Sequence, residues 1–579
     1  MFHSLLRRSL AGFVAGLLPA LSLAAAPGPE YSTVLRQGMV YDGSGARPFV
    51  GDVAWQGDRI VYVGPQAPGK GAIEFDARGK AIAPGFVNML AHPFESLLID
   101  GRALSDLRQG ITLEVFGELS MGPLNEPMKA DFARQMDPSV KLDWTSLGEY
   151  FEKLVARGIT PNVASFVSAG TVRVHELGED NIKPNAQQLE QMRLRVREAM
   201  EQGALGLTSA LIYAPYSFAS TEELSTLASE SARCGGMYIV HMRSEADRLF
   251  EAVDETIRIA RESGAPAEIY HLKIAGRDNW HKLDGVIERV EAARRDGTRI
   301  TANMYLYPAG ATGLDAAMPL WVQEGGYAKW AERLKDPAVR ERVAREMNAP
   351  ARDWENLYQA AGPEGMLLLA FKNPALRPYI GKTLAEVAKL RGTSPAETAM
   401  QLVIEDGTRV GVAYFLMSED NIRRQVQLPW MSFGSDAAAP APEGVFLQQS
   451  EHPRAYGNFA RLLARYVRDE KLLPLEEAVR RLTSFPVENL NIPERGRLKN
   501  GYFADIVVFD PAKVQDHATF QNPHQLSTGV TDVWVNGARA LADSEATRST
   551  SGRFVRGRAY RGPEGGGCRA SSKDWTWRP

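Results

Sequence analysis

Eight short apolar runs recur through the middle of the chain and constrain its fold more than any other feature. Helical patterns, such as residues 186–201 and 249–262, separate most of them. Strands that alternate with helices are typical of parallel sheets, and eight such units can close into a barrel. We therefore predict an α/β fold with a (β/α)8 TIM-like barrel over residues 81–489. The runs cover residues 81–88, 111–117, 162–168, 205–209, 237–241, 267–271, 299–304 and 431–436.

The interval between the seventh and eighth runs is much longer than the others. It contains helical patterns at residues 337–347, 384–390 and 395–404. Long excursions from a barrel often carry binding loops or lids. We predict an inserted lid region over residues 310–412.

Short alternating segments occupy both ends of the mature chain. Residues 33–63 contain several, separated by Gly and Asp turns, and similar alternating segments occur at residues 504–509 and 532–535. This pattern predicts a small antiparallel sheet. Both ends together predict a β-sandwich domain formed from residues 27–80 and 490–561. A glycine triplet and a polar run then predict a disordered tail over residues 562–579.

The N-terminus predicts a cleavable signal peptide over residues 1–26. Arg7 and Arg8 precede an apolar run at residues 10–23, and small residues follow. The run is short for a membrane span and Pro19 interrupts it, so no stable membrane insertion is expected. Sec or twin-arginine export would place the protein in the periplasm or outside the cell.

The bulk composition excludes some partners. The formal net charge of the 579 residues is -3, which gives no support for binding nucleic acid. Hydrophobic residues make up 44% and charged residues 24%, as in ordinary soluble proteins. The two cysteines, Cys234 and Cys568, supply neither a disulfide framework nor zinc-ligand spacing.

Candidate metal ligands follow the predicted strands, where the active residues of such barrels lie. His241 and His271 end consecutive runs, and Glu118 follows the second run. Neutral imidazole and carboxylate suit Zn²⁺, and a His₂Glu set leaves one position for water. Asp436 ends the eighth run and could take the proton of that water and pass it to a leaving nitrogen. The alternative is that these histidines are ordinary core residues.

Three further residues could bind substrate. Lys273 lies two residues beyond His271, Tyr305 follows the seventh run, and Arg454 follows the eighth. Lysine and arginine suit a substrate carboxylate, although the same residues also serve as surface ion pairs. His92 follows the first run, in GFVNMLAHPFES, and is at most a weak ligand, because Leu90 stands where a partner histidine would be needed.

Several segments, in order and spacing, resemble the D-aminoacylase (N-acyl-D-amino-acid deacylase) branch of the amidohydrolase superfamily. They include APGFVNML, VHMRSEAD, YHLKIAG, NMYLYPAGATGL, HPRAYG and RGRLKNGYFADIVVFDP. The resemblance covers most of the mature chain and implies a zinc-bearing barrel with a β-sandwich. It also implies zinc ligation by His241 and His271, catalysis by Asp436, and carboxylate contacts from Lys273, Tyr305 and Arg454.

The chain departs from the family pattern at three places. A first-strand His-x-His is replaced by Leu90-Ala91-His92, and Glu118 occupies the position inferred for a metal-binding cysteine. Ala311 stands where a serine is expected to bind the substrate carboxylate. These changes predict a single metal ion, zinc first, with manganese or iron as alternatives.

The sequence therefore predicts a metal-dependent hydrolase of linear amide C–N bonds. The expected substrate is a small molecule, an N-acyl-D-amino acid or a related small peptide. Two alternatives stay open: a D-aminopeptidase or dipeptidase acting on cell-wall fragments, and a non-catalytic binding protein on a degenerate barrel, to which Leu90 and Ala311 point.

Overall fold

The structure is a computed structural model that describes residues 30–351, 353–562 and 568. The predicted signal peptide lies outside the described residues. So does the predicted tail, apart from residues 562 and 568.

The eight predicted runs occupy the eight strand positions of a barrel. Nearly all of their residues are buried, as expected for parallel strands covered on both faces. All neighbouring strands that pair do so in parallel. The strands are β6 (Phe86–Ala91), β7 (Ile111–Phe116), β8 (Asn162–Ser165) continued by β9 (Val167–Ser168), β10 (Gly206–Ala210), β11 (Met237–His241), β12 (Ala267–Ile269), β13 (Ile300–Met304) and β17 (Met431–Phe433).

Hydrogen-bonded strand ladders do not close the barrel. Within the described residues one ladder joins β6, β7 and β8, and a second runs from β9 to β17. Past the strand ends, the Asp436 N–H donates to the Leu90 carbonyl and the His92 N–H donates to the Ala437 carbonyl, each at 2.8 Å. These two bonds bring the ends of β6 and β17 together.

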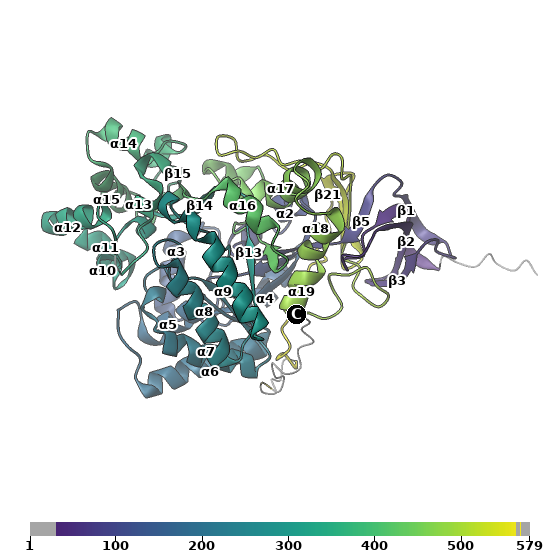
Figure 1. The fold of residues 1–579 in the computed structure, drawn as a ribbon, viewed down its shortest axis with the longest axis horizontal. Coiled ribbons are helices and arrows are strands. Elements are labelled where there is room, and N and C mark those ends of the chain that lie inside the picture. Colours follow the sequence, from purple (N-terminus) through teal and green to yellow (C-terminus); the bar gives the residue numbers. More distant parts are fainter. Residues whose placement is uncertain (1–29, 352, 563–567, 569–579) are drawn as a thin grey trace, which may run out of the picture.

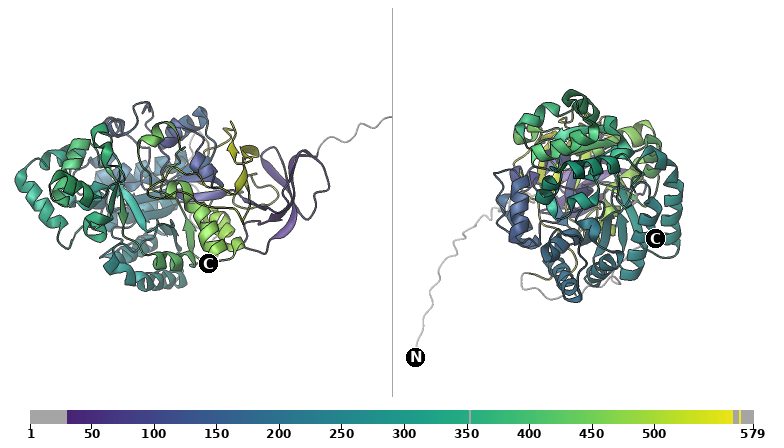
Figure 2. Two further views of the ribbon diagram at one scale, coloured as in Figure 1. Left: turned by 90° about the horizontal axis from the view of Figure 1, so that it is seen from above. Right: turned by 90° about the vertical axis from the view of Figure 1, so that its left-hand side faces the viewer.

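Helices surround the strands, as Figures 1 and 2 show. Helix α6 (Ala186–Gln202) illustrates how the sequence fixes the limits of these helices: Asn185 and Gln188 form a capping box at its start, and Gly203 ends it in a left-handed conformation. The main outer helices are α4 (Leu147–Arg157), α6 (Ala186–Gln202), α7 (Thr221–Arg233), α8 (Leu249–Ser263), α9 (Leu283–Arg295), α16 (Glu419–Val426) and α18 (Leu475–Leu482).

Both chain ends build one nine-stranded sheet. The two ends meet where β5 pairs antiparallel with β18, with Ala83 opposite Val507. The sheet is not wholly antiparallel: β4 and β5 lie one after the other along the same edge of β1 and pair with it in parallel. Its strands are β1 (Tyr31–Val40), β2 (Phe49–Gln56), β3 (Arg59–Gly64), β4 (Gly71–Asp76), β5 (Ala81–Pro84), β18 (Ile506–Phe509), β19 (Val530–Val535), β20 (Ala538–Ala542) and β21 (Glu545–Ala546).

The first predicted run divides at Gly85. Its first half is β5 in the nine-stranded sheet, and its second half is β6 in the barrel. An added Cβ on Gly85 would lie 2.1 Å from Thr112 Oγ1, so the close passage of the chain here requires glycine.

The excursion between β13 and β17 forms a compact unit with its own apolar cluster around Trp330 and Met400. Strands β14 (Ala309–Gly313), β16 (Gly411–Phe415) and β15 (Met366–Ala370) make a three-stranded antiparallel sheet. The unit and the nine-stranded sheet lie at opposite ends of the barrel (Figures 1 and 2). Its helices are α10 (Leu320–Gln323), α11 (Gly326–Arg333), α12 (Pro337–Met347), α13 (Leu357–Ala361), α14 (Leu384–Arg391) and α15 (Pro395–Asp406).

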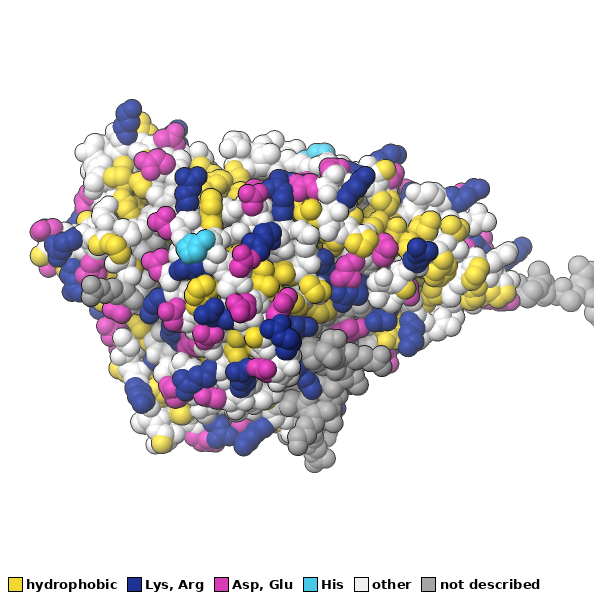
Figure 3. Space-filling view, in the orientation of Figure 1, with side chains coloured by type: hydrophobic (Ala, Val, Ile, Leu, Met, Phe, Trp, Pro, Cys, Tyr) yellow, Lys and Arg dark blue, Asp and Glu magenta, His cyan; other side chains and the backbone are white. Residues whose placement is uncertain are grey.

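The surface carries positive and negative side chains intermixed over the barrel helices, whereas hydrophobic side chains are denser over the nine-stranded sheet (Figure 3). Exposed Val50 and Ile73 belong to that sheet. The two cysteines form one disulfide, between Cys234 at the end of α7 and Cys568. In the part of the chain that the structure describes, no helix combines the length and hydropathy that crossing a membrane requires.

Candidate metal centre and active site

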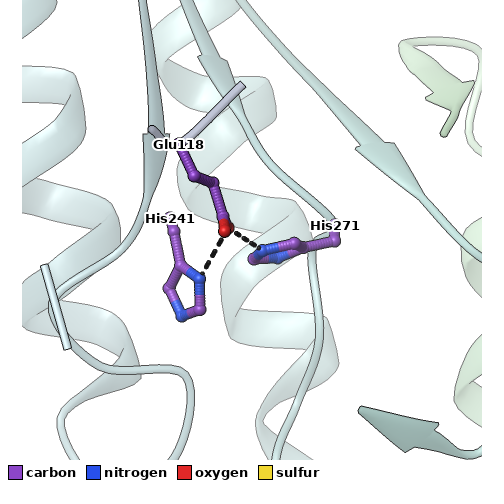
Figure 4. Close-up of side chains that lie close together, drawn as sticks. All are labelled: Glu118, His241 and His271. Atoms are coloured by element: carbon purple, nitrogen blue, oxygen red, sulfur yellow. Dashed lines mark hydrogen bonds and ion pairs between the residues drawn. The ribbon is translucent and has the colours of Figure 1, made fainter. Parts of the chain in front are cut away.

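Three of the predicted ligands converge at the carboxyl ends of the barrel strands. His241 ends β11, His271 follows β12, and Glu118 follows β7. The Oε1 atom of Glu118 lies 2.8 Å from His241 Nδ1 and 2.7 Å from His271 Nε2 (Figure 4). Two imidazole nitrogens and one carboxylate oxygen therefore point at one another, within 4.8 Å. This donor set fits Zn²⁺, which prefers nitrogen and carboxylate ligands in a tetrahedral arrangement.

A second group of possible ligands shares Glu118 with the first. It consists of His92, Glu118 and Asp436, whose ligand atoms also lie within 4.8 Å of one another. His92 Nε2 is 2.9 Å from Asp436 Oδ1 and 3.6 Å from Glu118 Oε2. Sequence analysis named all three residues but did not group them, because the missing partner at Leu90 gave His92 only a weak role.

The backbone is strained at three of these residues. The φ angles are 64° at Glu118, 32° at His271 and 51° at Asp436. Residues other than glycine rarely adopt a positive φ angle, because it costs roughly 1–3 kcal/mol for each residue. The three residues come from different strand ends, so the strain is concentrated at the cluster.

Opposite charges hold the site in its ionised form. Burial alone would raise the pKa of Glu118, but the charges of His241 and His271 keep it well below the usual value. Burial would lower the pKa of His241, but Glu245 and Glu118 outweigh it and raise that pKa to about 9. For Asp436, Arg454 and His271 outweigh burial and lower the pKa to about 2, so this carboxylate is ionised at neutral pH.

Glu245 is a buried site residue that sequence analysis missed. Both of its carboxylate oxygens accept hydrogen bonds from Lys273 Nζ at 2.9 Å, and Oε1 lies 3.2 Å from His271 Nδ1. Burial would raise the pKa of Glu245, but Lys273 and the two histidines hold it well below its ordinary value. A carboxylate behind a ligating histidine fixes the orientation and tautomer of the ring. Its only sequence signal was its place four residues after His241.

The excursion reaches this network through Glu355, which sequence analysis also missed. Its carboxylate accepts hydrogen bonds from the Glu245 N–H at 2.8 Å and from the Ser244 hydroxyl at 2.7 Å. Burial raises the pKa of Glu355 to about 7. The loop that carries Glu245 is therefore fastened to the unit outside the barrel.

The predicted substrate-binding residues Lys273, Tyr305 and Arg454 line the cavity beside the candidate ligands, and we call them the cationic wall. Arg454 Nη1 lies 2.7 Å from Asp436 Oδ2, and its guanidinium lies 4.5 Å from the centre of the Tyr305 ring. Lys273 Nζ lies 5.8 Å from the same ring. Ala311 does not replace a serine hydroxyl, although its carbonyl oxygen is 3.5 Å from Arg454 Nη2.

A cavity of about 640 Å³ contains all eight predicted site residues in its lining. The unit between β13 and β17 forms part of its wall through Thr312 and Arg409, and Arg409 pairs with Asp315 at 2.7 Å. Pockets of this size hold ligands as large as typical drugs. The predicted residues are His92, Glu118, His241, His271, Lys273, Tyr305, Asp436 and Arg454.

Comparison with known proteins identifies the family. Residues 74–540 match the model of the amidohydrolase family. The chain belongs to the amidohydrolase family. D-aminoacylase of Alcaligenes xylosoxydans xylosoxydans is 29% identical over 532 residues, which is 91% of this chain and 97% of that enzyme.

Two solved structures share the whole fold of this amidohydrolase. A D-aminoacylase studied for its binuclear metal centre, with one-metal activation and second-metal attenuation, is 28% identical, covers 91% of this chain and 100% of its own, and has a TM-score of 0.76. The N-acyl-D-glutamate deacylase of Bordetella bronchiseptica, complexed with zinc and a phosphonate inhibitor, is 28% identical, covers 91% and 99%, and has a TM-score of 0.74. The chain thus has the α/β fold of these relatives, a TIM barrel with a β-sandwich, although hydrogen-bonded ladders do not close the barrel.

Proposed function

We propose that this amidohydrolase is a metal-dependent deacylase of N-acyl-D-amino acids or related small peptides. One observation carries the proposal: a His₂Glu cluster and the ionised Asp436 share a cavity with a buried cationic wall. Such a wall suits a substrate carboxylate, because arginine and lysine form charge-assisted hydrogen bonds with it. The D configuration is supported by the D-aminoacylase and N-acyl-D-glutamate deacylase to which the chain is similar.

Each residue has a defined part in the proposed reaction. When bound by Glu118, His241 and His271, zinc would lower the pKa of a water molecule and polarise the amide carbonyl. Asp436 is ionised and would accept a proton from water at Oδ1 or Oδ2, then return it to the departing nitrogen. Lys273, Tyr305 and Arg454 would bind the α-carboxylate and hold the scissile bond at the cluster.

One metal ion remains our proposal, held by Glu118, His241 and His271. The missing histidine at Leu90 supports it, and His92 Nε2 lies at hydrogen-bond distance, 2.9 Å, from Asp436 Oδ1. His92 would then serve to orient Asp436 rather than to bind the ion. We also propose that residues 310–412 act as a lid, which is supported by the lid residues in the cavity wall.

Export to an oxidising compartment is a further part of the proposal. The pairing of Cys234 with Cys568 supports it, since structural disulfides persist mainly in secreted and periplasmic proteins. The arginine pair and the apolar run that follows it give the independent sequence argument.

The test is a panel of N-acetyl D- and L-amino acids offered to zinc-supplemented protein. We expect zinc-dependent release of the D-amino acids, and loss of turnover in both Asp436→Asn and His271→Ala. The matched control is His281→Ala, which removes an exposed histidine outside the cavity. Turnover that survived both substitutions, or equal turnover of both enantiomers, would overturn the proposal.

A further inference from the structure

The cavity has a second, apolar wall that the proposed chemistry does not use. Phe94 and Met128 belong to the main apolar core, and Leu119, Phe132 and Val174 pack against it while also lining the cavity. We call these five residues the apolar wall. Two of them come from α3 (Glu126–Gln135), and Val174 comes from α5 (Ala169–Leu177).

The apolar wall faces the cationic wall across the metal ligands. Its residues follow β6, β7 and β9, the first three strand positions of the barrel. Lys273 and Tyr305 follow β12 and β13, the sixth and seventh positions. Strands four places apart in an eight-stranded barrel lie on opposite sides. Glu118 reaches across the mouth between the two walls, as its bonds to His241 and His271 show.

An N-acyl amino acid has the same polarity along its length. Its carboxylate belongs to the amine half, and the acyl chain leaves the carbonyl carbon in the opposite direction. With the carboxylate on Lys273 and Arg454 and the carbonyl at the metal ligands, the acyl chain must run toward the apolar wall. The amino-acid side chain branches from the carbon that bears the carboxylate and stays on the cationic side.

The cavity is also larger than an N-acetyl amino acid requires. Its volume of about 640 Å³ is room for roughly twenty water molecules, whereas N-acetyl-leucine has about a dozen non-hydrogen atoms, several of them in the side chain. Toward the surface, α3 carries an ion pair between Asp131 and Arg134. The side chain of Arg134 is 59% exposed. Along α3, the apolar wall therefore ends at a charged pair.

We propose that this enzyme is selective for N-acyl-D-amino acids with an apolar acyl chain longer than acetyl, bound by Phe94, Leu119, Met128, Phe132 and Val174. The proposal rests on the deacylase function above. Each methylene that is fully buried should raise kcat/KM about fourfold. The gain should stop when the chain reaches the Asp131–Arg134 pair, because further methylenes would remain in water.

The test uses N-acetyl-, N-butanoyl-, N-hexanoyl- and N-octanoyl-D-alanine with zinc-supplemented protein. We expect kcat/KM to rise at least tenfold from acetyl to hexanoyl. Phe132→Ser should lower the hexanoyl-to-acetyl ratio about tenfold, since it removes the ring from the wall. Ala133→Ser is the matched control, because Ala133 is exposed on the same helix and does not line the cavity. Turnover that was constant or fell with chain length would overturn the inference and leave the deacylase function standing.

Calorimetric titration of the same four compounds into Asp436→Asn separates the two proposals. Affinity that rises with chain length, without turnover by the wild type, would refute the deacylase function and support the apolar wall. Affinity that is independent of chain length, or absent for all four compounds, would overturn the inference whatever the wild type hydrolyses.

Discussion

Replacing Glu355 by glutamine tests the link between the lid and the site. Glu355 is 6% exposed and its pKa is raised to about 7 by burial, from an ordinary value of 4.5. The folded chain therefore holds this proton more tightly than the unfolded chain. The stability that the carboxyl contributes is full below pH 4.5 and is lost as the pH rises through about 7. Between pH 5 and pH 8 the loss amounts to roughly 2–3 kcal/mol.

Glutamine has nearly the same shape and stays neutral at both pH values. Its amide oxygen can accept the hydrogen bond from the Glu245 N–H, and its NH₂ group can donate to the Ser244 hydroxyl. The free energy of unfolding of Glu355→Gln should thus gain roughly 2–3 kcal/mol relative to the wild type between pH 5 and pH 8.

Equilibrium urea titrations at the two pH values measure this difference. Taking the difference between variant and wild type cancels the pH dependence of all other groups that the substitution leaves unchanged. Glu364→Gln makes the same chemical change at an exposed position of the lid and should show no such pH dependence. If the pH curves of wild type and Glu355→Gln were parallel, the buried carboxyl would not be linked to folding as argued.

Two further substitutions separate metal binding from proton transfer. Glu118→Gln removes the carboxylate that contacts both His241 and His271. Zinc affinity, measured by competition with a chelator, should fall by more than the roughly 10–100-fold that is typical when a residue behind the ligands is replaced. Unchanged affinity would exclude Glu118 as a ligand. Asp436→Asn should lower kcat/KM by about 10²–10⁴-fold while zinc content stays at the wild-type value, because it removes the proton acceptor and spares the His₂Glu set. Zinc loss in Asp436→Asn would instead make this residue a ligand.

The sequence was sufficient to predict the parallel strands of the barrel and the approach of the candidate ligands to one another. Parallel strands end on one face, so residues that follow separate runs, such as Glu118 and His271, had to approach one another. Periodicity could not reveal where the first run divides, because β5 and β6 are equally apolar and only Gly85 separates them.

The remaining site residues depend on contacts that no local pattern records. Glu355 lies 110 residues beyond Glu245, whose loop it holds, and it comes from an irregular segment of the lid. The Cys234–Cys568 pair spans 334 residues. The apolar wall was hidden for a different reason: Met128 and Phe132 follow an ordinary amphipathic pattern in α3, which predicts core packing and does not distinguish a cavity lining.

The positive φ angles at Glu118, His271 and Asp436 have a consequence for redesign. Glycine would relieve the backbone strain at each of these positions, but it would also leave the buried partners of Glu118 and Asp436 unpaired. Attempts to stabilise this protein should therefore hold these three positions fixed, because the strained backbone there presents side chains of the candidate metal centre.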